Sequence, residues 1–395
     1  MNKTLIIGAG GVGGVAVHKC VQLREVFGDI MLASRTLSKC EQIRQDVGGD
    51  IKTAQVDADD PASVVKLIER FKPDIVVHLA LPYQDLSIME ACLETGVPYI
   101  DTACHESPDD PHFTAVPQWG FHERYAAKGI MGVLGCGFDP GVTNAYCAHI
   151  QQKYLDEIHY VDIIDCNAGD HGHPFATNFN AEINIREITQ NGKYWEDGEW
   201  KVVESMSVSR DWDYPTIGPR KSYLLYHEEE ESLVKHIKGL KRIRFWMTFG
   251  EQYLTHLRVL QNVGMTGIEP VDYEGTPVIP LKFLQKVLPE PASLGKNYTG
   301  RVCIGCVCEG VKNGERKKYL IYCAISHQEA YNDAKNQAVA YTTGVPAMCG
   351  AMMMLNGTWK KPGVYNVEQL DVNPFLDAVG RHGLPWQVEE LPIEE

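Results

Sequence analysis

The stretch Leu5-Ile6-Ile7-Gly8-Ala9-Gly10-Gly11-Val12-Gly13 decides the fold of the first part of this chain. A short apolar run leads into Gly-x-Gly-x-x-Gly, and the helix-compatible segment 15–26 follows, as the dinucleotide-binding fingerprint requires. Gly8 permits the tight turn, Gly10 lets the backbone approach a pyrophosphate, and Gly13 lets the helix pack close to the strand. The free N–H groups at the helix start then face the phosphates. The expected cofactor contacts are therefore Gly8, Gly10, Gly11, Val12 and Gly13.

The second predicted strand, residues 30–33, ends at Ser34-Arg35-Thr36. In NAD-binding folds an acidic residue at this point holds the ribose 2′-hydroxyl. A guanidinium and two hydroxyls suit a 2′-phosphate instead, so Ser34, Arg35 and Thr36 predict NADP(H) as the cofactor. A solvated loop arginine would leave the same pattern.

The composition of the 395-residue chain is that of a globular protein of two or three domains. Its formal net charge of −15 argues against nucleic acid or an anionic membrane as a partner. A cationic substrate is compatible with this charge, but an acidic surface also simply aids solubility. We expect a cytoplasmic protein because the sequence lacks a secretory signal and any apolar run of transmembrane length. Its 12 cysteines are scattered and predict reduced thiols.

Residues 1–140 alternate short apolar runs with helical segments. The run 74–80 is almost continuously apolar, as expected of a strand covered on both faces. The pattern predicts a Rossmann-type, doubly wound parallel sheet of the α/β class. Ligands of such sheets lie beyond the carboxyl ends of the strands. Further cofactor contacts are therefore expected at Asp57, Ala58, Leu79, Ala80, Leu81, Asp101 and Thr102.

Residues 141–345 differ in texture, with alternating segments joined by hairpin signals. Asp197-Gly198 and Asn313-Gly314 are the strongest of these signals. We expect a second, α+β domain built on a mostly antiparallel sheet. Within it, the alternation of residues 180–189 predicts a strand, and the acidic run 228–231 is interpreted as a solvated helix start.

The last part of the chain is predicted to be helical. Ser326-His327-Gln328-Glu329 is a capping box, and the helix it begins is expected to stop at Gly344. Pro346 then starts a second, methionine-rich helix, which is too short to span a membrane and is therefore expected to be buried. Residues 346–395 form a C-terminal segment.

Two polar loops are candidates for the chemistry. The loop 135–144 surrounds Asp139 with glycines and a proline, and a helix start there favours an anionic group such as a substrate carboxylate, although a plain turn between domains fits too. The loop 170–180 carries His171 and His173, which supply an acid or base if the loop faces the substrate. A surface loop is the alternative.

The cysteines offer weaker candidates. Cys104 beside His105 could act as a nucleophile, but sequence neighbours seldom face each other as that chemistry requires. Cys303, Cys306 and Cys308 contain one Cys-x-x-Cys without a second pair at zinc-ribbon spacing. They are expected to pack as small apolar side chains, and no metal site is predicted.

The chain resembles the saccharopine dehydrogenase superfamily in several motifs, among them Gly8–Gly13, residues 33–36, residues 99–102 and residues 137–141. Phe175-Ala176-Thr177-Asn178-Phe179-Asn180-Ala181-Glu182-Ile183-Asn184-Ile185-Arg186-Glu187 looks like the carboxynorspermidine and carboxyspermidine dehydrogenase branch. Ile325–Ala330 and Thr342–Ala347 are similar to that branch too.

This resemblance implies NADPH-dependent reductive condensation of aspartate β-semialdehyde with a diamine in polyamine biosynthesis. Putrescine would give carboxyspermidine, and 1,3-diaminopropane would give carboxynorspermidine. The resemblance also implies a homodimer, with a substrate and dimerisation domain over 141–345 and a segment 346–395 that packs back on the NADP-binding domain 1–140.

The chemistry suggests roles for individual residues. His171 or His173 would transfer protons, because histidine titrates near neutrality. Arg186 would bind the carboxylate of the aldehyde, and Asp139 or Glu182 the distal ammonium of the diamine. The expected catalytic residues are thus His171, His173 and Asp139, and the expected substrate contacts are Tyr83, Asp139, Asn178, Glu182 and Arg186.

Two other functions fit the same sequence features. A saccharopine reductase or a homospermidine-forming enzyme would share the fold and the cofactor. A sensor that binds NADP(H) without turnover would share them too, because a fold does not fix a function.

Overall fold

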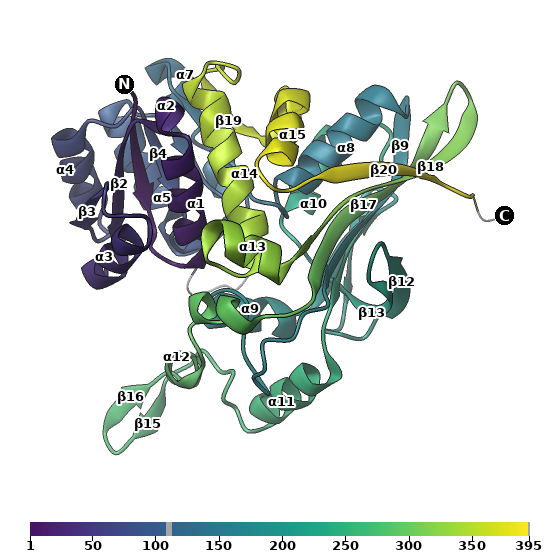
Figure 1. Ribbon diagram of the computed structural model, residues 1–395. Coiled ribbons are helices and arrows are strands. Elements are labelled where there is room, and N and C mark those ends of the chain that lie inside the picture. Colours follow the sequence, from purple (N-terminus) through teal and green to yellow (C-terminus); the bar gives the residue numbers. More distant parts are fainter. Residues whose placement is uncertain (108–112, 394–395) are drawn as a thin grey trace.

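The computed structural model describes residues 1–107 and 113–393, which build two β-sheets flanked by helices (Figure 1). The first sheet has seven parallel strands in the order β19-β8-β5-β4-β1-β2-β3. Apart from the added edge strand β19, this is the doubly wound order of dinucleotide-binding sheets. Its strands are β1 (Lys3–Ile7), β2 (Asp29–Ser34), β3 (Lys52–Gln55), β4 (Ile75–His78), β5 (Tyr99–Ile100), β8 (Met131–Leu134) and β19 (Gly363–Asn366).

Helices cover both faces of this sheet because its strands are apolar on both sides. Ile6 faces one apolar core with α1 and α14, whereas Leu5 and Ile7 face another with α4 and α5. The helices of this half of the molecule are α1 (Gly11–Gln22), α2 (Arg24–Phe27), α3 (Leu37–Asp46), α4 (Pro61–Phe71), α5 (Asp85–Thr95), α6 (Val116–Trp119), α7 (His122–Lys128) and α14 (Ala338–Leu355). The predicted doubly wound sheet is confirmed.

The second sheet has nine strands and is antiparallel except where β14 pairs with β9. The hairpins at Asp197-Gly198 and Asn313-Gly314 are confirmed, and each pair of turn residues has positive φ. The strands are β9 (Glu157–Asn167), β10 (Gly192–Glu196), β11 (Glu199–Val203), β12 (Ser209–Tyr214), β13 (Gly218–Leu225), β14 (Arg242–Thr248), β17 (Arg301–Lys312), β18 (Glu315–Ser326) and β20 (Trp386–Leu391).

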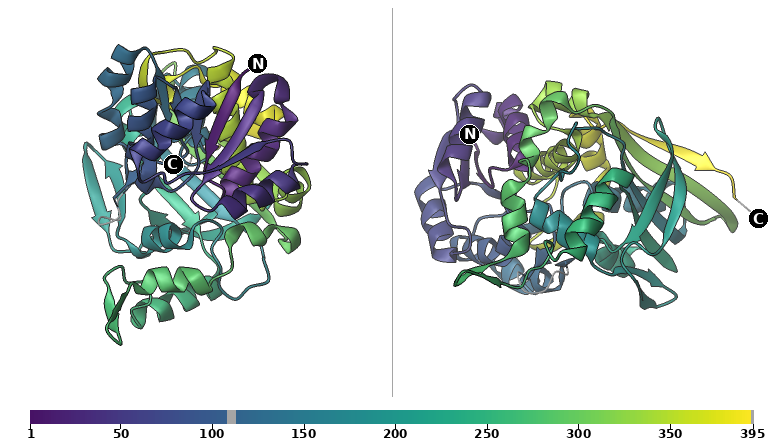
Figure 2. Two further views of the ribbon diagram at one scale, coloured as in Figure 1. Left: turned by 90° about the vertical axis from the view of Figure 1, so that its left-hand side faces the viewer. Right: turned by 90° about the horizontal axis from the view of Figure 1, so that it is seen from below.

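Further helices pack on the second sheet or extend from it. They are α8 (Val142–Lys153), α9 (Ala181–Thr189), α10 (Glu229–His236), α11 (Glu251–Asn262), α12 (Pro280–Val287), α13 (His327–Ala334) and α15 (Val372–Arg381). Two small hairpins complete the fold: β6 (His105–Glu106) with β7 (Phe113–Thr114), and β15 (Val271–Tyr273) with β16 (Thr276–Val278). The second hairpin and α12 project from the body of the molecule (Figures 1 and 2).

The strand predicted at residues 180–189 is wrong, because this segment is helix α9. The Asn180 side chain caps the helix by accepting hydrogen bonds from the backbone N–H groups of Glu182 and Ile183, at 3.0 and 3.2 Å. Ile185 and Ile188 then pack against α11 and α12 at helical spacing. The alternation of Ile183 and Ile185 imitated a strand because both are buried.

The predicted helix end at Gly344 is also wrong. Helix α13 stops at Ala334, and the single helix α14 runs from Ala338 through Gly344 and Pro346 to Leu355. Gly344 serves close packing instead: a Cβ there would lie 2.8 Å from the side chain of Val15 on α1. By length and composition α14 could cross a membrane, but 78% of it is buried inside the protein, so it is the core helix between the two sheets.

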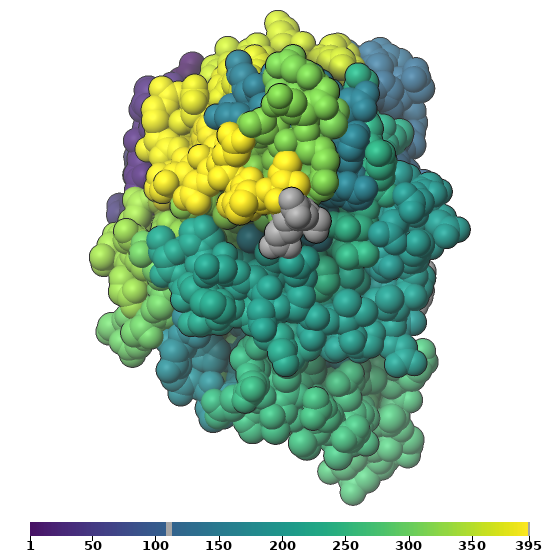
Figure 3. Space-filling view, turned by 90° about the vertical axis from the view of Figure 1, so that its right-hand side faces the viewer, coloured from purple at the N-terminus to yellow at the C-terminus, as the bar shows by residue number. Residues whose placement is uncertain are grey.

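The C-terminal segment contacts both sheets. β19 pairs with β8 in the first sheet, and β20 pairs with β18 in the second. Figure 3 shows the C-terminal residues in yellow lying directly against the green and teal surface of the second domain. The expected boundary between residues 345 and 346 falls inside α14.

Candidate active site

The glycine-rich turn after β1 has the geometry of a phosphate cradle. Gly8 has φ of +122°, and a Cβ there would lie 2.3 Å from the backbone of Leu79. A Cβ on Gly13 would lie 1.9 Å from the Gly8 carbonyl oxygen, so only glycine lets α1 pack this close to β1. A Cβ on Gly10, by contrast, would meet nothing within 4 Å, and this open space lies at the N-terminus of α1. These residues fit a bound dinucleotide.

The neighbouring residues of the turn help to seat α1. Gly11 faces Ala340 of α14, where an added Cβ would lie at 3.2 Å, and Val12 is partly buried in the core. The loop after β4, with Leu79, Ala80 and Leu81, lies directly beside Gly8.

The residues expected to bind the 2′-phosphate of the cofactor ribose lie at the end of β2. The Arg35 side chain is 71% exposed, and its guanidinium lies 3.7 Å from Asp59. Such an exposed pair contributes little to stability, so a phosphate can take its place. The backbone N–H of Thr36 donates to the Ser34 hydroxyl at 3.4 Å. After β3, Asp57 is exposed at the same edge of the sheet, whereas Ala58 is buried.

Asp101 does not offer its side chain to a cofactor, in contrast to the expectation from sequence. Its carboxylate accepts hydrogen bonds from the Gly135 N–H at 2.6 Å, the Tyr99 hydroxyl at 2.7 Å and the Gln118 amide at 2.7 Å. Burial, first of all, and the nearby Asp85 raise the pKa of Asp101 to about 8. Asp101 therefore ties together the ends of β5 and β8, and Thr102 follows at the surface of this edge.

Beyond these strand ends, five ionisable side chains from both halves of the molecule meet in what we call the acid cluster. Its members are Asp139, Asp165, Glu187, His227 and Glu229. They come from the loop after β8, from β9, from α9 and from the start of α10. The Asp139 loop packs beside the nucleotide-binding sheet, since an added Cβ on Gly137 would lie 3.2 Å from the Thr102 carbonyl oxygen.

His227 stands among these carboxylates. Its Nδ1 is hydrogen-bonded to Glu229, and its Nε2 lies 3.6 Å from Glu187. Burial opposes a charged imidazole, but Glu229, Glu187 and Asp139 raise the pKa of His227 well above its ordinary value. One imidazolium thus faces four carboxyl groups, more than it could neutralise if all four were ionised.

Burial and this crowding raise the pKa values of three of the carboxylates. Burial and the surrounding carboxylates raise the pKa of Asp165 and of Glu187 to about 7, although His227 acts in the opposite direction. Burial and Asp165 raise the pKa of Asp139 well above its ordinary value. The Glu187 Oε1 atom is buried without a hydrogen-bond partner. A cationic ligand would stabilise the ionised form of all of these carboxylates at once.

The interpretation of residues 228–231 as a solvated helix start is wrong. Glu228, Glu229 and Glu230 are at most 5% exposed. Glu228 accepts the Cys104 N–H at 2.9 Å, whereas both oxygens of Glu230 are buried without partners. The run was misinterpreted because four adjacent acids are usually exposed, and nothing in their order shows which strand end they face.

Sequence reasoning also missed Asp165, Glu187 and His227 as site residues. One available signal was Asp165 itself, which with Asp162 interrupts the otherwise apolar centre of strand β9. A charge on a buried strand is costly unless it has a function or a partner. Glu187 and His227 carry no comparable mark in the sequence.

A second group, which we call the mixed-charge cluster, consists of Tyr83, Glu106, Glu182 and Arg186. Arg186 donates through Nε to Glu106 at 2.9 Å and through Nη2 to the Ser107 carbonyl at 3.0 Å. The guanidinium also lies 5.6 Å from the centre of the Tyr83 ring. Burial raises the pKa of Glu106 to about 7 even though Arg186 acts against this shift. Arg186, expected to bind a substrate carboxylate, thus already pairs with Glu106.

The structure brings neither His171 nor His173 into the acid cluster. The two rings lie 5.7 Å apart, and His171 lies 5.3 Å from the ring of Tyr298. His173 is exposed, and the main charged neighbours of His171 are His173 and Asp170. Asn178 accepts the Tyr298 hydroxyl at 2.7 Å, which fixes the far end of this loop.

The cysteines are all buried. Burial and Glu228 raise the pKa of the Cys104 thiol well above its ordinary value, which disfavours the thiolate that a nucleophile needs. The Cys306 thiol on β17 donates to the Thr143 carbonyl of α8 at 3.6 Å. Over residues 1–107 and 113–393, the structure shows no group of three or more His, Cys, Asp or Glu side chains placed to hold a metal ion.

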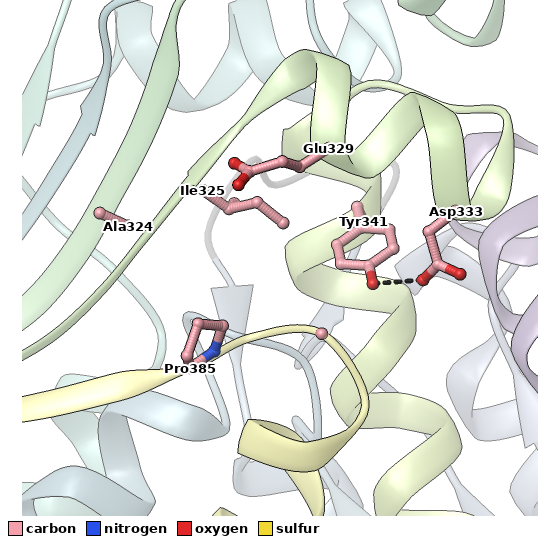
Figure 4. A pocket seen from close by; sticks show the side chains of 7 residues that line it. Ala324, Ile325, Glu329, Asp333, Tyr341 and Pro385 are labelled. Atoms are coloured by element: carbon pink, nitrogen blue, oxygen red, sulfur yellow. Dashed lines mark hydrogen bonds between the residues drawn. The ribbon is translucent and has the colours of Figure 1, made fainter.

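One surface pocket of about 260 Å³ lies apart from these groups. Ala324, Ile325, Glu329, Asp333, Tyr341, Gly383 and Pro385 line it (Figure 4). Its carboxylates already have partners: Asp333 binds Lys19 and Tyr341, and Glu329 binds Ser326. The pocket therefore lacks the unpaired charge of the acid cluster.

Comparison with known proteins agrees with this architecture. Residues 4–133 match the saccharopine dehydrogenase NADP binding domain, and residues 137–384 match the saccharopine dehydrogenase C-terminal domain. The structure of saccharopine dehydrogenase (L-Glu forming) from Saccharomyces cerevisiae superposes with a TM-score of 0.75 over 99% of this chain and 100% of that one, at 14% identity, which confirms the fold class.

Relatives of known activity cover nearly the whole sequence. The chain is 55% identical to carboxyaminopropylagmatine dehydrogenase of Synechocystis sp. and 42% identical to carboxynorspermidine synthase of Vibrio cholerae, over 98% of this chain and 97% of each relative. The match to the family models and to these relatives shows that the chain belongs to the saccharopine dehydrogenase family.

Proposed function

We propose that this enzyme joins a cationic primary amine to aspartate β-semialdehyde and reduces the resulting C=N bond with NADPH. The observation that carries the proposal is the acid cluster. It lies beyond the ends of the nucleotide-binding sheet, where ligands of such folds react, and it holds four carboxylates against one histidine. A cationic amine supplies the missing charge. The homology to two enzymes of polyamine synthesis supports the same reaction type.

The proposed amine is agmatine. The relative at 55% identity is named for an agmatine product, and agmatine carries a guanidinium. A guanidinium offers five donors in a planar fork, which suits several carboxylates better than a point charge does. Putrescine and 1,3-diaminopropane, the diamines expected from the sequence, are the alternatives, supported by the 42% identity to carboxynorspermidine synthase.

The proposed cofactor is NADPH rather than NADH. The NADP-binding domain is present, and the exposed Arg35 with Ser34 and Thr36 would hold the 2′-phosphate. The turn from Gly8 to Gly13 would hold the pyrophosphate. When bound, the cofactor supplies the hydride that reduces the substrate carbon.

The test is NADPH oxidation with aspartate β-semialdehyde and, in separate assays, agmatine, putrescine, 1,3-diaminopropane or lysine. We expect the highest kcat/KM with agmatine and slower oxidation of NADH. Preference for a diamine or for lysine would reassign the amine. NADPH binding without oxidation in any assay would favour a sensor and contradict the proposal.

A variant connects this assay to the acid cluster. Glu229→Gln should raise the KM for the amine by about 30-fold, because the cluster that would receive the cationic amine loses one negative charge. Glu230→Gln is the matched control, since Glu230 is equally buried but is not among the main charged neighbours of Asp139 or Asp165. An unchanged KM in Glu229→Gln would remove the amine from this cluster.

We also propose a homodimer formed through the projecting segment 251–297. Six of the ten exposed large apolar side chains of the described residues lie there: Val259, Val263, Val271, Tyr273, Phe283 and Val287. A two-stranded hairpin such as β15–β16 is only marginally stable alone, so packing against a second copy would stabilise it. Light scattering should give a dimer mass for the wild type and a monomer mass for Phe283→Glu. A monomeric wild type would contradict the proposal.

A further inference from the structure

The junction between helices α13 and α14, residues 335–337, lies between the two halves of the molecule (Figure 1). Two consecutive amide side chains in it are buried: Asn336 is 6% exposed and Gln337 is 0% exposed. A buried amide is costly unless both its oxygen and its nitrogen have hydrogen-bond partners. Both amides are paired at each end, so their partners show what the junction holds together.

Asn336 connects the junction to the glycine-rich turn. Its Nδ2 atom donates to the Gly11 carbonyl oxygen at 3.2 Å, and its Oδ1 atom accepts the backbone N–H of Gln337 at 3.0 Å. Gly11 is the first residue of α1, where the pyrophosphate of the cofactor is expected. The start of α1 is thus tied directly to the start of α14.

Gln337 continues this connection into the second domain. Its Oε1 atom caps α14 by accepting hydrogen bonds from two backbone N–H groups of the first turn, at 2.6 and 3.3 Å. Its Nε2 atom donates to the Asn178 carbonyl oxygen at 2.5 Å. Asn178 lies in the loop 170–180, two residues before Asn180, which caps α9. Helix α9 in turn carries residues of both the acid cluster and the mixed-charge cluster.

A second series of hydrogen bonds also ends at Asn178. At the start of α13, His327 accepts the Ala338 N–H at Nδ1 and donates from Nε2 to the Asn167 Oδ1 atom, each at 3.0 Å. Burial lowers the pKa of His327 to about 3, so the ring stays neutral and Nδ1 can accept. The Asn167 amide donates to the Tyr298 hydroxyl at 2.9 Å, which donates to the Asn178 Oδ1 atom at 2.7 Å. The backbone and the side chain of Asn178 are therefore both fixed from the α13–α14 unit.

We propose that Asn336 and Gln337 are positioning residues that couple the cofactor turn to the loop 170–180, so that NADPH binding orders this loop for the substrates. The identity of these substrates rests on the proposed function, whereas the coupling itself requires only NADPH. Asn178 was expected to contact the substrate, but its carbonyl and its Oδ1 atom already have protein partners. In this proposal it is the end point of the coupling.

The coupling has a simple physical basis. NADPH bound at the start of α1 would stabilise the position of the turn in which the Gly11 carbonyl accepts from Asn336. A ligand shifts an equilibrium by the difference between its affinities for the two states, and the effect is reciprocal. The ordered loop should therefore favour NADPH as much as NADPH favours the ordered loop.

Hydrogen–deuterium exchange with NADPH alone tests the coupling. In the wild type, saturating NADPH should slow exchange of the backbone amides of residues 170–180 about tenfold. In Gln337→Ser the exchange rates with and without NADPH should agree within about twofold. Serine can still cap α14 but is too short to reach the Asn178 carbonyl, so the helix start is kept while the connection is lost. Asn336→Ala should have the same effect, because it breaks the connection at Gly11.

Ser326→Ala is the matched control. It removes the cap of α13, where the Ser326 hydroxyl accepts the Glu329 N–H at 3.1 Å, and neither series of hydrogen bonds includes these two residues. Protection by NADPH should stay at the wild-type level in this variant, with saturation of each protein confirmed by NADPH fluorescence. Protection that persists in Gln337→Ser and Asn336→Ala, or that is missing from the wild type, would overturn the coupling. Equal loss of protection in Ser326→Ala would overturn it too, because any weakening of α13 would then suffice.

Kinetics separate this inference from the proposed function. At saturating NADPH, Gln337→Ser should raise the KM for the amine that supports NADPH oxidation about fivefold, while kcat stays within about threefold. If NADPH protects the loop in the wild type but not in the variants, and no amine supports oxidation, the proposed function fails and the coupling stands. If oxidation proceeds with an unchanged KM for the amine in Gln337→Ser, the proposed function stands and the role of the loop in positioning the substrate is wrong.

Discussion

The acid cluster and the mixed-charge cluster lie on the same helix, α9, but balance their charges differently. In the mixed-charge cluster, Arg186 donates hydrogen bonds to the Glu106 Oε1 atom at 2.9 Å and to the Ser107 carbonyl at 3.0 Å. In the acid cluster, four carboxylates share the single cation His227. The first cluster pairs one arginine with one buried glutamate, although the Glu106 Oε2 atom and the Tyr83 hydroxyl are buried without hydrogen-bond partners, whereas the second sets one histidine against four carboxyl groups.

The two clusters also connect the two halves of the molecule in different ways. Arg186 joins the second domain to Glu106 beside the nucleotide-binding sheet, so its ion pair holds the two halves together. The acid cluster draws on the same two halves, but its one histidine is shared: Nδ1 of His227 is hydrogen-bonded to Glu229, and Nε2 lies 3.6 Å from the Glu187 Oε1 atom. We therefore expect the mixed-charge cluster to contribute mainly to stability and, on the proposed function, the acid cluster to bind the amine. Three experiments test whether the two clusters have these different roles.

Arg186→Met should have the largest effect on stability. It leaves the Glu106 carboxylate buried without its cation, and breaking one side of a buried ion pair typically costs about 3–5 kcal/mol. Urea unfolding of the cofactor-free protein measures this loss. The double variant Glu106→Gln with Arg186→Met should recover part of it, since no stranded charge remains. A loss below about 1 kcal/mol in Arg186→Met would show that this pair does not hold the halves together.

The acid cluster should make the substrate-free protein less stable as the pH rises. Folding raises the pKa of Asp165 from 3.8, and of Glu187 from 4.5, to about 7, so the folded state binds more protons than the unfolded state between these values. The stability they contribute is present below about pH 4 and is lost as the pH rises through about 7.

Thermal unfolding checks this sign. Between pH 5 and pH 8 the wild-type Tm should fall by at least about 2 °C more than that of the double variant Asp165→Asn with Glu187→Gln. Agmatine should raise the wild-type Tm more at pH 8 than at pH 5, because it replaces the lost protons. If the Tm of the wild type and that of the double variant depend on pH in the same way, Asp165 and Glu187 do not bind extra protons in the folded protein.

The sequence predicted the nucleotide-binding half well because its signals are local. The turn from Gly8 to Gly13 and the apolar strand within 74–80 each depend on neighbouring residues, as does the hairpin at Asn313-Gly314 in the second sheet, and the structure contains all of them. The strand predicted over 180–189 is wrong because the helix cap at Asn180 and the packing against α11 and α12 outweighed the apparent alternation. The local pattern alone could not decide between a strand and a helix for this segment.

The acid cluster could be predicted only in part, for a physical reason. Asp139 was expected from its constrained loop, but Asp165, Glu187 and Glu229 approach it from three other elements. Their shared environment depends on how β9, α9 and α10 pack, which no spacing in the sequence encodes. The same holds for Arg186, whose charge was recognised but whose partner, Glu106, lies 80 residues away.

Tyr83→Phe should have the smallest effect on stability and sharpens the comparison further. The Tyr83 hydroxyl is buried without a hydrogen-bond partner, so its removal should change the free energy of unfolding by less than about 0.5 kcal/mol. The sequence predicts Tyr83 as a substrate contact; if its hydroxyl binds the aldehyde, the KM for aspartate β-semialdehyde should rise about threefold while the KM for the amine stays constant. Tyr125→Phe is the control: its hydroxyl donates to the Met89 carbonyl at 2.8 Å, so that variant should lose about 1 kcal/mol of stability and keep both KM values. A rise in the KM for the amine with Tyr83→Phe would show that the mixed-charge cluster also takes part in binding the amine. The two clusters would then not have separate roles.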